Sequence, residues 1–179
     1  MKGFEKFLEW AKKHDWIIET AEEGKYKLPE IYKGKIGYIE QLAEKYKCIC
    51  NPDEDAWLVF GEHISEHGED GFAWDTFKNI TLNACDTDDE FDKQLYKEAY
   101  NWWEKHYPFY IAVYDCYEFY AVNTDDGSVV YGMEPMFEDA EKVADSVDEF
   151  FENVIAGKVY FGFAQYFEQD ENDEDRFIG

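Results

Sequence analysis

Apolar residues near the start of the chain recur at helical spacing. The residues that share this spacing are Phe4, Phe7, Leu8 and Ala11. They fall at positions i, i+3, i+4 and i+7, which places all four on one face of an α-helix. The pattern therefore predicts an amphipathic helix over residues 3–14, and a similar stripe predicts a second helix over residues 36–47.

Two segments match the capping box, in which a Ser or Thr and a Glu three residues later satisfy the free N–H groups at a helix start. These segments are residues 87–90 and 146–149. We expect the helix that begins at residues 87–90 to run to about His106. The second should stop at Gly157, since glycine readily adopts the left-handed conformation that ends many helices.

Alternating apolar and polar residues predict a group of strands in the second half of the chain. The three segments concerned are residues 109–115, 118–123 and 128–133. Asp125, Asp126 and Gly127 form a tight-turn signal between the last two, because Gly127 can adopt a positive φ. We therefore predict a three-stranded antiparallel meander. Residues 56–61 are expected to form a buried strand, and residues 71–84 one extended strand or a bent pair.

The 179 residues fit one domain, and no linker or internal repeat divides them. The predicted domain covers residues 1–167. Half of residues 168–179 are acidic and the segment has no apolar period, so we expect a solvated, mobile tail.

The charge is strongly negative and unevenly distributed. The chain carries 42 acidic and 17 basic residues, a formal charge of −25. Residues 1–47 contain ten lysines and nine acidic residues, whereas residues 48–179 contain seven basic and 33 acidic residues. The anionic field therefore belongs to the larger, later part of the chain.

This charge restricts the possible partners. Nucleic acids and anionic membranes would be repelled, so neither is expected as a partner. A basic protein would be attracted, and its encounter with the chain would be accelerated. The alternative is that the charge serves solubility alone.

Metal and catalytic motifs are incomplete. His63 and His67 fit the H-x-x-E-H pattern of one zinc peptidase class. Gly61 and Gly68 bracket the pattern closely, and a helix that short cannot hold two ligands rigidly. The alternative is a polar loop, so both histidines are candidate metal ligands only. No catalytic group or cofactor is expected.

The four cysteines offer no complete zinc site either. Cys48 and Cys50 form a C-x-C pair, but the sequence contains no second pair to complete four ligands. The N-terminal residues lack the apolar core of a signal peptide, and no stretch is long enough to span a membrane. We therefore expect reduced thiols and a cytoplasmic protein.

Acidic residues near aromatic ones are the candidates for partner binding, because exposed Tyr or Trp beside carboxylates can anchor a protein interface. The candidate residues are Asp86, Asp88, Asp89, Asp125 and Asp126, with Trp57 and Trp74 as possible anchors. Part of this cluster has a structural explanation, since acids in the first turn of a helix favour its dipole.

Several segments together resemble the SUKH superfamily. The hairpin FYAVNTDDGSVVYG at residues 119–132, an acidic connection and the helix VADSVDEFFENVI at residues 143–155 are similar to its strand pair and closing helix. Leu28, Pro29 and Tyr32 are similar to the LP-x-x-Y element of the family, and AWLVFG at residues 56–61 to its first core strand. Residues 62–106 fit the pattern poorly, as an inserted segment would.

This resemblance implies an α+β fold, with a mostly antiparallel or mixed sheet flanked by helices, and no enzymatic activity. Many bacterial members look like immunity proteins that neutralise a cognate toxin, often a nuclease, and fungal relatives regulate cell-wall assembly. We therefore expect a protein-binding domain, an immunity protein with a basic toxin as its partner. The alternatives are a regulatory or scaffolding domain of the same family, or a small hydrolase using carboxylates or the two histidines.

Overall fold

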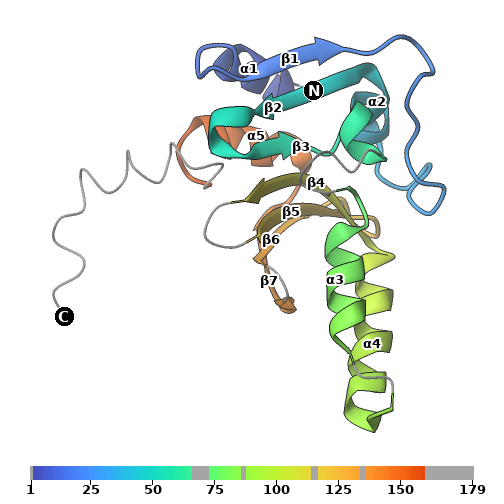
Figure 1. The fold of residues 1–179 in the computed structure, drawn as a ribbon. Coiled ribbons are helices and arrows are strands. Elements are labelled where there is room, and N and C mark those ends of the chain that lie inside the picture. Colours follow the sequence, from blue (N-terminus) through green and yellow to red (C-terminus); the bar gives the residue numbers. More distant parts are fainter. Residues whose placement is uncertain (1, 66–72, 86–87, 114–116, 134–135, 160–179) are drawn as a thin grey trace, which may run out of the picture.

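The computed structural model describes residues 2–65, 73–85, 88–113, 117–133 and 136–159 (Figure 1). The helices are α1 (Lys2–Ala11), α2 (Tyr38–Lys45), α3 (Thr76–Ala84), α4 (Glu90–Trp103) and α5 (Val147–Ile155), with 3₁₀ turns η1 (Pro52–Glu54) and η2 (Gly61–Ile64). The strands are β1 (Ile17–Thr20), β2 (Tyr46–Asn51), β3 (Ala56–Leu58), β4 (His106–Val113), β5 (Tyr117–Asn123), β6 (Val129–Met133) and β7 (Met136–Ala144).

The strands form one sheet in the order of the sequence, β1 to β7, and every neighbouring pair is antiparallel. The connections are short except between β1 and β2, where α2 intervenes, and between β3 and β4, where η2, α3 and α4 intervene. The predicted α+β class, with an antiparallel sheet flanked by helices, is confirmed.

Helices contact both faces of the sheet because successive side chains of a strand point to opposite faces. On β5, Phe119 contacts Trp103 of α4 at a ring distance of 5.0 Å. The next residue, Tyr120, contacts Phe150 of α5 at 4.8 Å. Phe151 of α5 packs in turn on Phe7 of α1, at 4.6 Å. Helices α1 and α5 thus cover one face, and the base of the α3–α4 hairpin covers the other.

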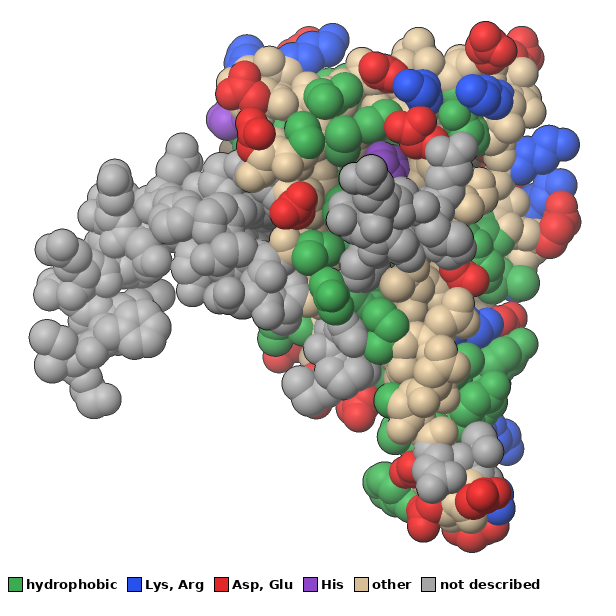
Figure 2. All heavy atoms as spheres, viewed as in Figure 1, with side chains coloured by type: hydrophobic (Ala, Val, Ile, Leu, Met, Phe, Trp, Pro, Cys, Tyr) green, Lys and Arg blue, Asp and Glu red, His purple; other side chains and the backbone are tan. Residues whose placement is uncertain are grey.

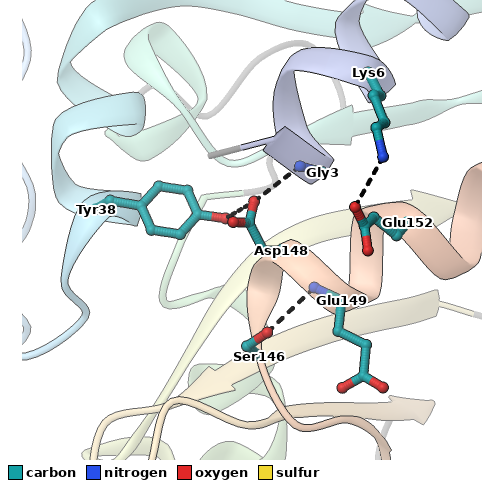
Figure 3. Close-up of polar contacts among 7 residues, drawn as sticks. All are labelled: Gly3, Lys6, Tyr38, Ser146, Asp148, Glu149 and Glu152. Carbon is teal, nitrogen blue, oxygen red and sulfur yellow. Dashed lines mark hydrogen bonds and ion pairs between the residues drawn. The ribbon is translucent and has the colours of Figure 1, made fainter.

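Asp148 joins three elements on the α1–α5 side (Figure 3). Its Oδ1 accepts hydrogen bonds from the backbone N–H of Gly3 and from the hydroxyl of Tyr38, both at 3.2 Å. Gly3 is required by close packing, since a Cβ atom there would lie 2.2 Å from the carbonyl oxygen of Asp148. Burial would raise the pKa of Asp148, but the positive charge of the N-terminus and hydrogen bonds that include those from the Phe4 backbone and the Tyr38 hydroxyl lower it overall. The carboxylate therefore holds α1, α2 and α5 together.

The predicted meander and four predicted helices are present, with shifted ends. The helix expected over residues 36–47 ends at Lys45, because the chain continues as β2. The helix expected to start at Thr87 instead has Asp89 as its N-cap, whose carboxylate accepts from the backbone N–H groups of Phe91 and Asp92. Ser146 caps α5 as predicted, accepting from the N–H of Glu149.

The extended structure predicted over residues 71–84 is wrong, because residues 76–84 form α3. Phe77 and Thr81 are its buried residues, and they are four residues apart, as on one helical face. The sequence pattern also does not predict strands β1, β2 and β7. The expected domain boundary at residue 167 and the tail at residues 168–179 lie outside the described residues.

Tyr32 fixes the long connection between β1 and α2. Its ring is 1% exposed, and its hydroxyl donates to the carbonyl oxygens of Trp103 at 2.6 Å and His106 at 3.1 Å. Burial, followed by the nearby Glu104 and Asp75, raises the pKa of Tyr32, so the hydroxyl stays protonated and can donate. This contact ties the connection to the end of α4 and the start of β4.

Replacing Tyr32 with phenylalanine should therefore lower the free energy of unfolding by about 1–3 kcal/mol, the usual cost of leaving buried acceptors unsatisfied. Urea unfolding followed by circular dichroism measures this change. Tyr96→Phe is the matched control, since Tyr96 is 37% exposed on α4 and should change stability by less than about 0.5 kcal/mol. Equal effects of the two substitutions would contradict the assigned role of Tyr32.

Candidate functional site

The α3–α4 hairpin extends away from the sheet (Figure 1). We call its described residues, 76–84 and 88–103, the α3–α4 arm. Its base is fixed by Phe77, which stacks on Trp103 at 6.1 Å and contacts Phe119 of the sheet at 5.0 Å. Lys78 of α3 also pairs with Glu104 at 2.7 Å, and its side chain is only 12% exposed. The arm is therefore anchored at its base and exposed along its outer part.

Aromatic side chains are exposed along α4. Phe91 is 75% exposed, the highest value among the large hydrophobic residues described, and Tyr96 and Tyr100 are 37% and 42% exposed. Tyr96 and Tyr100 are four residues apart and so share one side of the helix. Lys78 lies over the ring of Tyr100 at 4.1 Å, which orients this tyrosine. Phe91 is five residues before Tyr96, about 140° around the helix, so its exposed ring lies on a different side of α4 from the two tyrosines.

Acidic residues surround Phe91 at the free end of the arm. Residues 88–93 contain four acidic residues and one lysine, Lys93, which pairs with the exposed Glu90 at 2.7 Å. Asp88 and Asp89 are both exposed. Figure 2 shows acidic side chains gathered at this end and hydrophobic side chains along the arm. The free end is thus an apolar anchor within a negatively charged rim.

The structure divides the acidic residues singled out in the sequence into two groups. Asp86 lies outside the described residues, and Asp88 and Asp89 precede α4. Asp125 and Asp126 occupy the β5–β6 turn beside the opposite end of α4. Because α4 has 14 residues, it separates the two groups by about 21 Å.

The β5–β6 turn is held by its own contacts. Asp125 pairs with Lys105 at 2.6 Å, and both side chains are more than half exposed. Asp126 accepts from the backbone N–H and the hydroxyl of Ser128, at 2.9 and 2.6 Å, and these hydrogen bonds lower its pKa. Gly127 has a φ of 77°, as this tight turn requires. These acids therefore have a structural role in the hairpin.

Neither tryptophan chosen as an anchor is a freely exposed side chain. Trp57 is 9% exposed within β3 and belongs to the core, so its assignment as a surface anchor is corrected. Trp74 is half-buried and packs edge-on against Tyr32 at 5.6 Å. Phe91, at the start of α4, is the exposed aromatic instead. The sequence signal that could have identified it is its position among the acidic residues of the first helical turn.

A second cluster joins Cys48 and Cys50 of β2 with His63 of η2. The sulfur atoms are 3.0 Å apart, and Sγ of Cys48 is 3.6 Å from Nε2 of His63. Their three ligand atoms all lie within 4.8 Å of one another, and no other such group of His, Cys, Asp or Glu occurs in the described part of the chain. His67, the other histidine of the motif, lies outside the described residues.

Local backbone geometry explains how this cluster forms. Residues i and i+2 of a strand point to the same face, so the C-x-C spacing brings the two thiols together on β2. Gly61 begins η2 with a φ of 54°, and a Cβ atom there would lie 2.1 Å from the carbonyl oxygen of Lys47. Only glycine permits this approach of η2 to β2, which brings His63 beside the cysteines.

The two thiols differ in their ionisation. The hydrogen bond from Cys48, together with His63, lowers the pKa of Cys50 to about 5. Cys48 donates that hydrogen bond, and this donation, together with burial, raises the pKa of Cys48. At neutral pH the pair therefore carries one thiolate next to an imidazole, which is a good starting arrangement for a soft metal ion.

No protein-family model matches this sequence, and neither a curated protein nor a solved structure is significantly similar to it. Within the described segments, none of the helices has both the length and the apolar character needed to cross a bilayer. The function must therefore be inferred from the residues and their arrangement.

Proposed function

We propose that this chain is a cytoplasmic, non-enzymatic protein-binding domain of the SUKH type, an immunity protein that binds and neutralises a basic toxin. The observation that carries the proposal is the exposure of Phe91 within the acidic free end of the α3–α4 arm. The SUKH resemblance supplies the biological role, and the arm supplies the binding surface.

An aromatic residue surrounded by polar groups is the usual arrangement at the centre of a protein interface. Phe91 supplies apolar area that a partner can bury, and Tyr96 and Tyr100 offer a second, separate aromatic area on another side of α4. The acids around Phe91 set the charge of the partner, because complementary potentials steer association and exclude proteins of like charge.

A nuclease toxin suits this surface because it must bind phosphate groups and therefore carries a cationic cleft. An acidic arm that projects from its domain can enter such a cleft and occupy the positions of the phosphates. The net charge of −25 would add long-range attraction to the contact at the arm.

Two alternatives would use the chain differently. A regulatory or scaffolding domain would present the same arm to a partner that is not a toxin. A hydrolase would need His63 on an α-helix that continues to residue 67, whereas η2 is a 3₁₀ turn that ends at Ile64. The geometry of the described residues therefore favours binding over hydrolysis by this motif.

The proposal is tested by mixing the purified chain with basic toxin nuclease domains, beginning with one encoded by an adjacent gene. We expect a one-to-one complex in size-exclusion chromatography and loss of nuclease activity. Lysozyme, a basic protein without a nuclease cleft, is the control. Binding to a non-nuclease partner without any inhibition would favour the scaffolding alternative, and failure to bind any basic toxin would contradict the proposal.

The contribution of charge is tested with the double variant Asp88→Asn/Asp89→Asn. Asparagine is as good an N-cap as aspartate, so α4 should keep its start while the free end loses two charges. We expect the association rate to fall about 3- to 10-fold at low salt and much less at high salt, because salt screens exposed charges. Stopped-flow association kinetics measures both conditions, and equal rates for variant and wild type at low salt would contradict a role for these acids.

A further inference from the structure

We propose that Cys48, Cys50 and His63 form a zinc site with three protein ligands and one open coordination position. This inference is independent of the proposed function, because the cluster lies on β2 and η2 rather than on the α3–α4 arm. Two thiolates and an imidazole are a ligand set that Zn²⁺ accepts in proteins, with water in the fourth position.

The distances are close to those of a tetrahedral centre. With Zn–S near 2.3 Å and Zn–N near 2.0 Å, a tetrahedral site places sulfur and nitrogen about 3.5 Å apart and two sulfurs about 3.8 Å apart. Sγ of Cys48 and Nε2 of His63 are 3.6 Å apart, which already fits. The two sulfurs, at 3.0 Å, need to separate by about 0.8 Å, which rotation of the two side chains can supply.

The ligands are held in place before any metal binds. Cys48 is buried, and Cys50 and His63 are half-buried, so few alternative side-chain positions are open to them. Trp57 pairs with Cys50 across β2 and β3, and its ring stacks on the His63 imidazole at 5.9 Å and 28°. The buried Trp57 is thus a positioning residue for the histidine.

The charges around the cluster also favour a cation. Glu62 precedes His63 in η2, and Glu19 lies on β1 next to β2. Both carboxylates interact electrostatically with Cys48, so they add negative potential at the site. Lys47 pairs with Glu19 at 2.6 Å and lies 3.9 Å from Glu62, so it offsets part of this potential.

Soft thiolates could also select Cu(I), and the pair could instead oxidise to a disulfide. Zn²⁺ is favoured because the imidazole lies at the sulfur–nitrogen separation expected for a tetrahedral site. A disulfide between the two cysteines would not involve the imidazole. These other possibilities are outcomes of the test below.

The test uses the full chain, purified under reducing conditions and stripped with a chelator. Titration with Zn²⁺ against a chromophoric chelator should give one ion per chain, confirmed by elemental analysis. Titration with Co²⁺ should produce the near-ultraviolet absorption of cobalt–thiolate bonds and the visible bands of a tetrahedral centre. Metal binding without these bands would place the ion on carboxylates and overturn the proposal.

Matched variants separate this site from general binding to an acidic protein. Cys50→Ser and His63→Ala should weaken Zn²⁺ affinity about 100-fold or more, because each removes one of three ligands. Cys85→Ser is the control, since Cys85 is a free cysteine at the end of α3, and it should leave affinity unchanged. Affinity that survives the cluster variants, preference for Cu(I) over Zn²⁺ in the same competition, or a Cys48–Cys50 disulfide that resists the reductant would each overturn the zinc assignment.

Discussion

Replacing Phe91 with alanine should weaken the binding of a basic toxin about 30-fold, or about 2 kcal/mol, as expected for an aromatic residue at the centre of an interface. Phe91 is 75% exposed, so its loss should leave the fold intact. The reason for the effect is the apolar area that the partner would bury on this ring. Isothermal titration calorimetry measures the affinity, and circular dichroism checks the fold.

Ile17→Ala is the matched control for this prediction. Ile17 is a large apolar residue that is 42% exposed on β1, at the edge of the sheet and not on the arm. Its replacement removes exposed apolar area without touching the proposed surface, so affinity should stay within about 2-fold. If Phe91→Ala bound as tightly as the wild type, or if Ile17→Ala lost as much affinity, the arm would not be the binding surface.

Replacing Gly61 with alanine should lower the free energy of unfolding by about 2–5 kcal/mol. Two costs combine at this position. An alanine is strained at a φ of 54°, and its Cβ would lie 2.1 Å from one backbone carbonyl oxygen of β2 and 2.2 Å from another. Backbone atoms cannot rotate away as a side chain can, so η2 and β2 would have to separate. Chemical unfolding measures the loss, and zinc titration should show weaker binding because His63 moves away from the cysteines.

Gly24→Ala separates these two costs. Gly24 has a φ of 74°, but a Cβ atom there would meet no atom within 4 Å. Its replacement should therefore cost only the backbone strain, about 1–2 kcal/mol. If Gly61→Ala destabilised the protein no more than Gly24→Ala does, the close approach of η2 to β2 would not constrain the fold.

Elements with strong local signals could be predicted from the sequence. The β4–β6 meander has regular alternation and a turn containing Gly127, and α5 has the Ser146 cap. β1 and β7 carry no such signal, because they are edge strands and most of their described side chains are exposed. In α3, the spacing of Phe77 and Thr81 fits a helix, but the apolar and polar residues of this segment also alternate as in a strand. Packing of Phe77 against α4 and the sheet stabilises the helix.

The candidate sites depend on long-range geometry that a single sequence does not contain. Cys50 and His63 are separated by β3 and η1, and the sequence pattern does not predict β2, the strand that aligns the two cysteines. Phe91 fits the apolar stripe of α4, but the stripe extends beyond the part of the sheet that could bury it. Asp88 and Asp89, chosen from the sequence as partner-binding candidates, are exposed, whereas Phe91 beside them could be identified only from the projection of the arm.

Hydrogen–deuterium exchange of the chain, alone and bound to a basic toxin nuclease, tests most directly whether the α3–α4 arm is the binding surface. If the arm is the binding surface, we expect slower exchange in residues 88–100 of the complex, with exchange in residues 17–20 of β1 unchanged. Slower exchange confined to the edges of the sheet, with α4 exchanging as in the free chain, would contradict it.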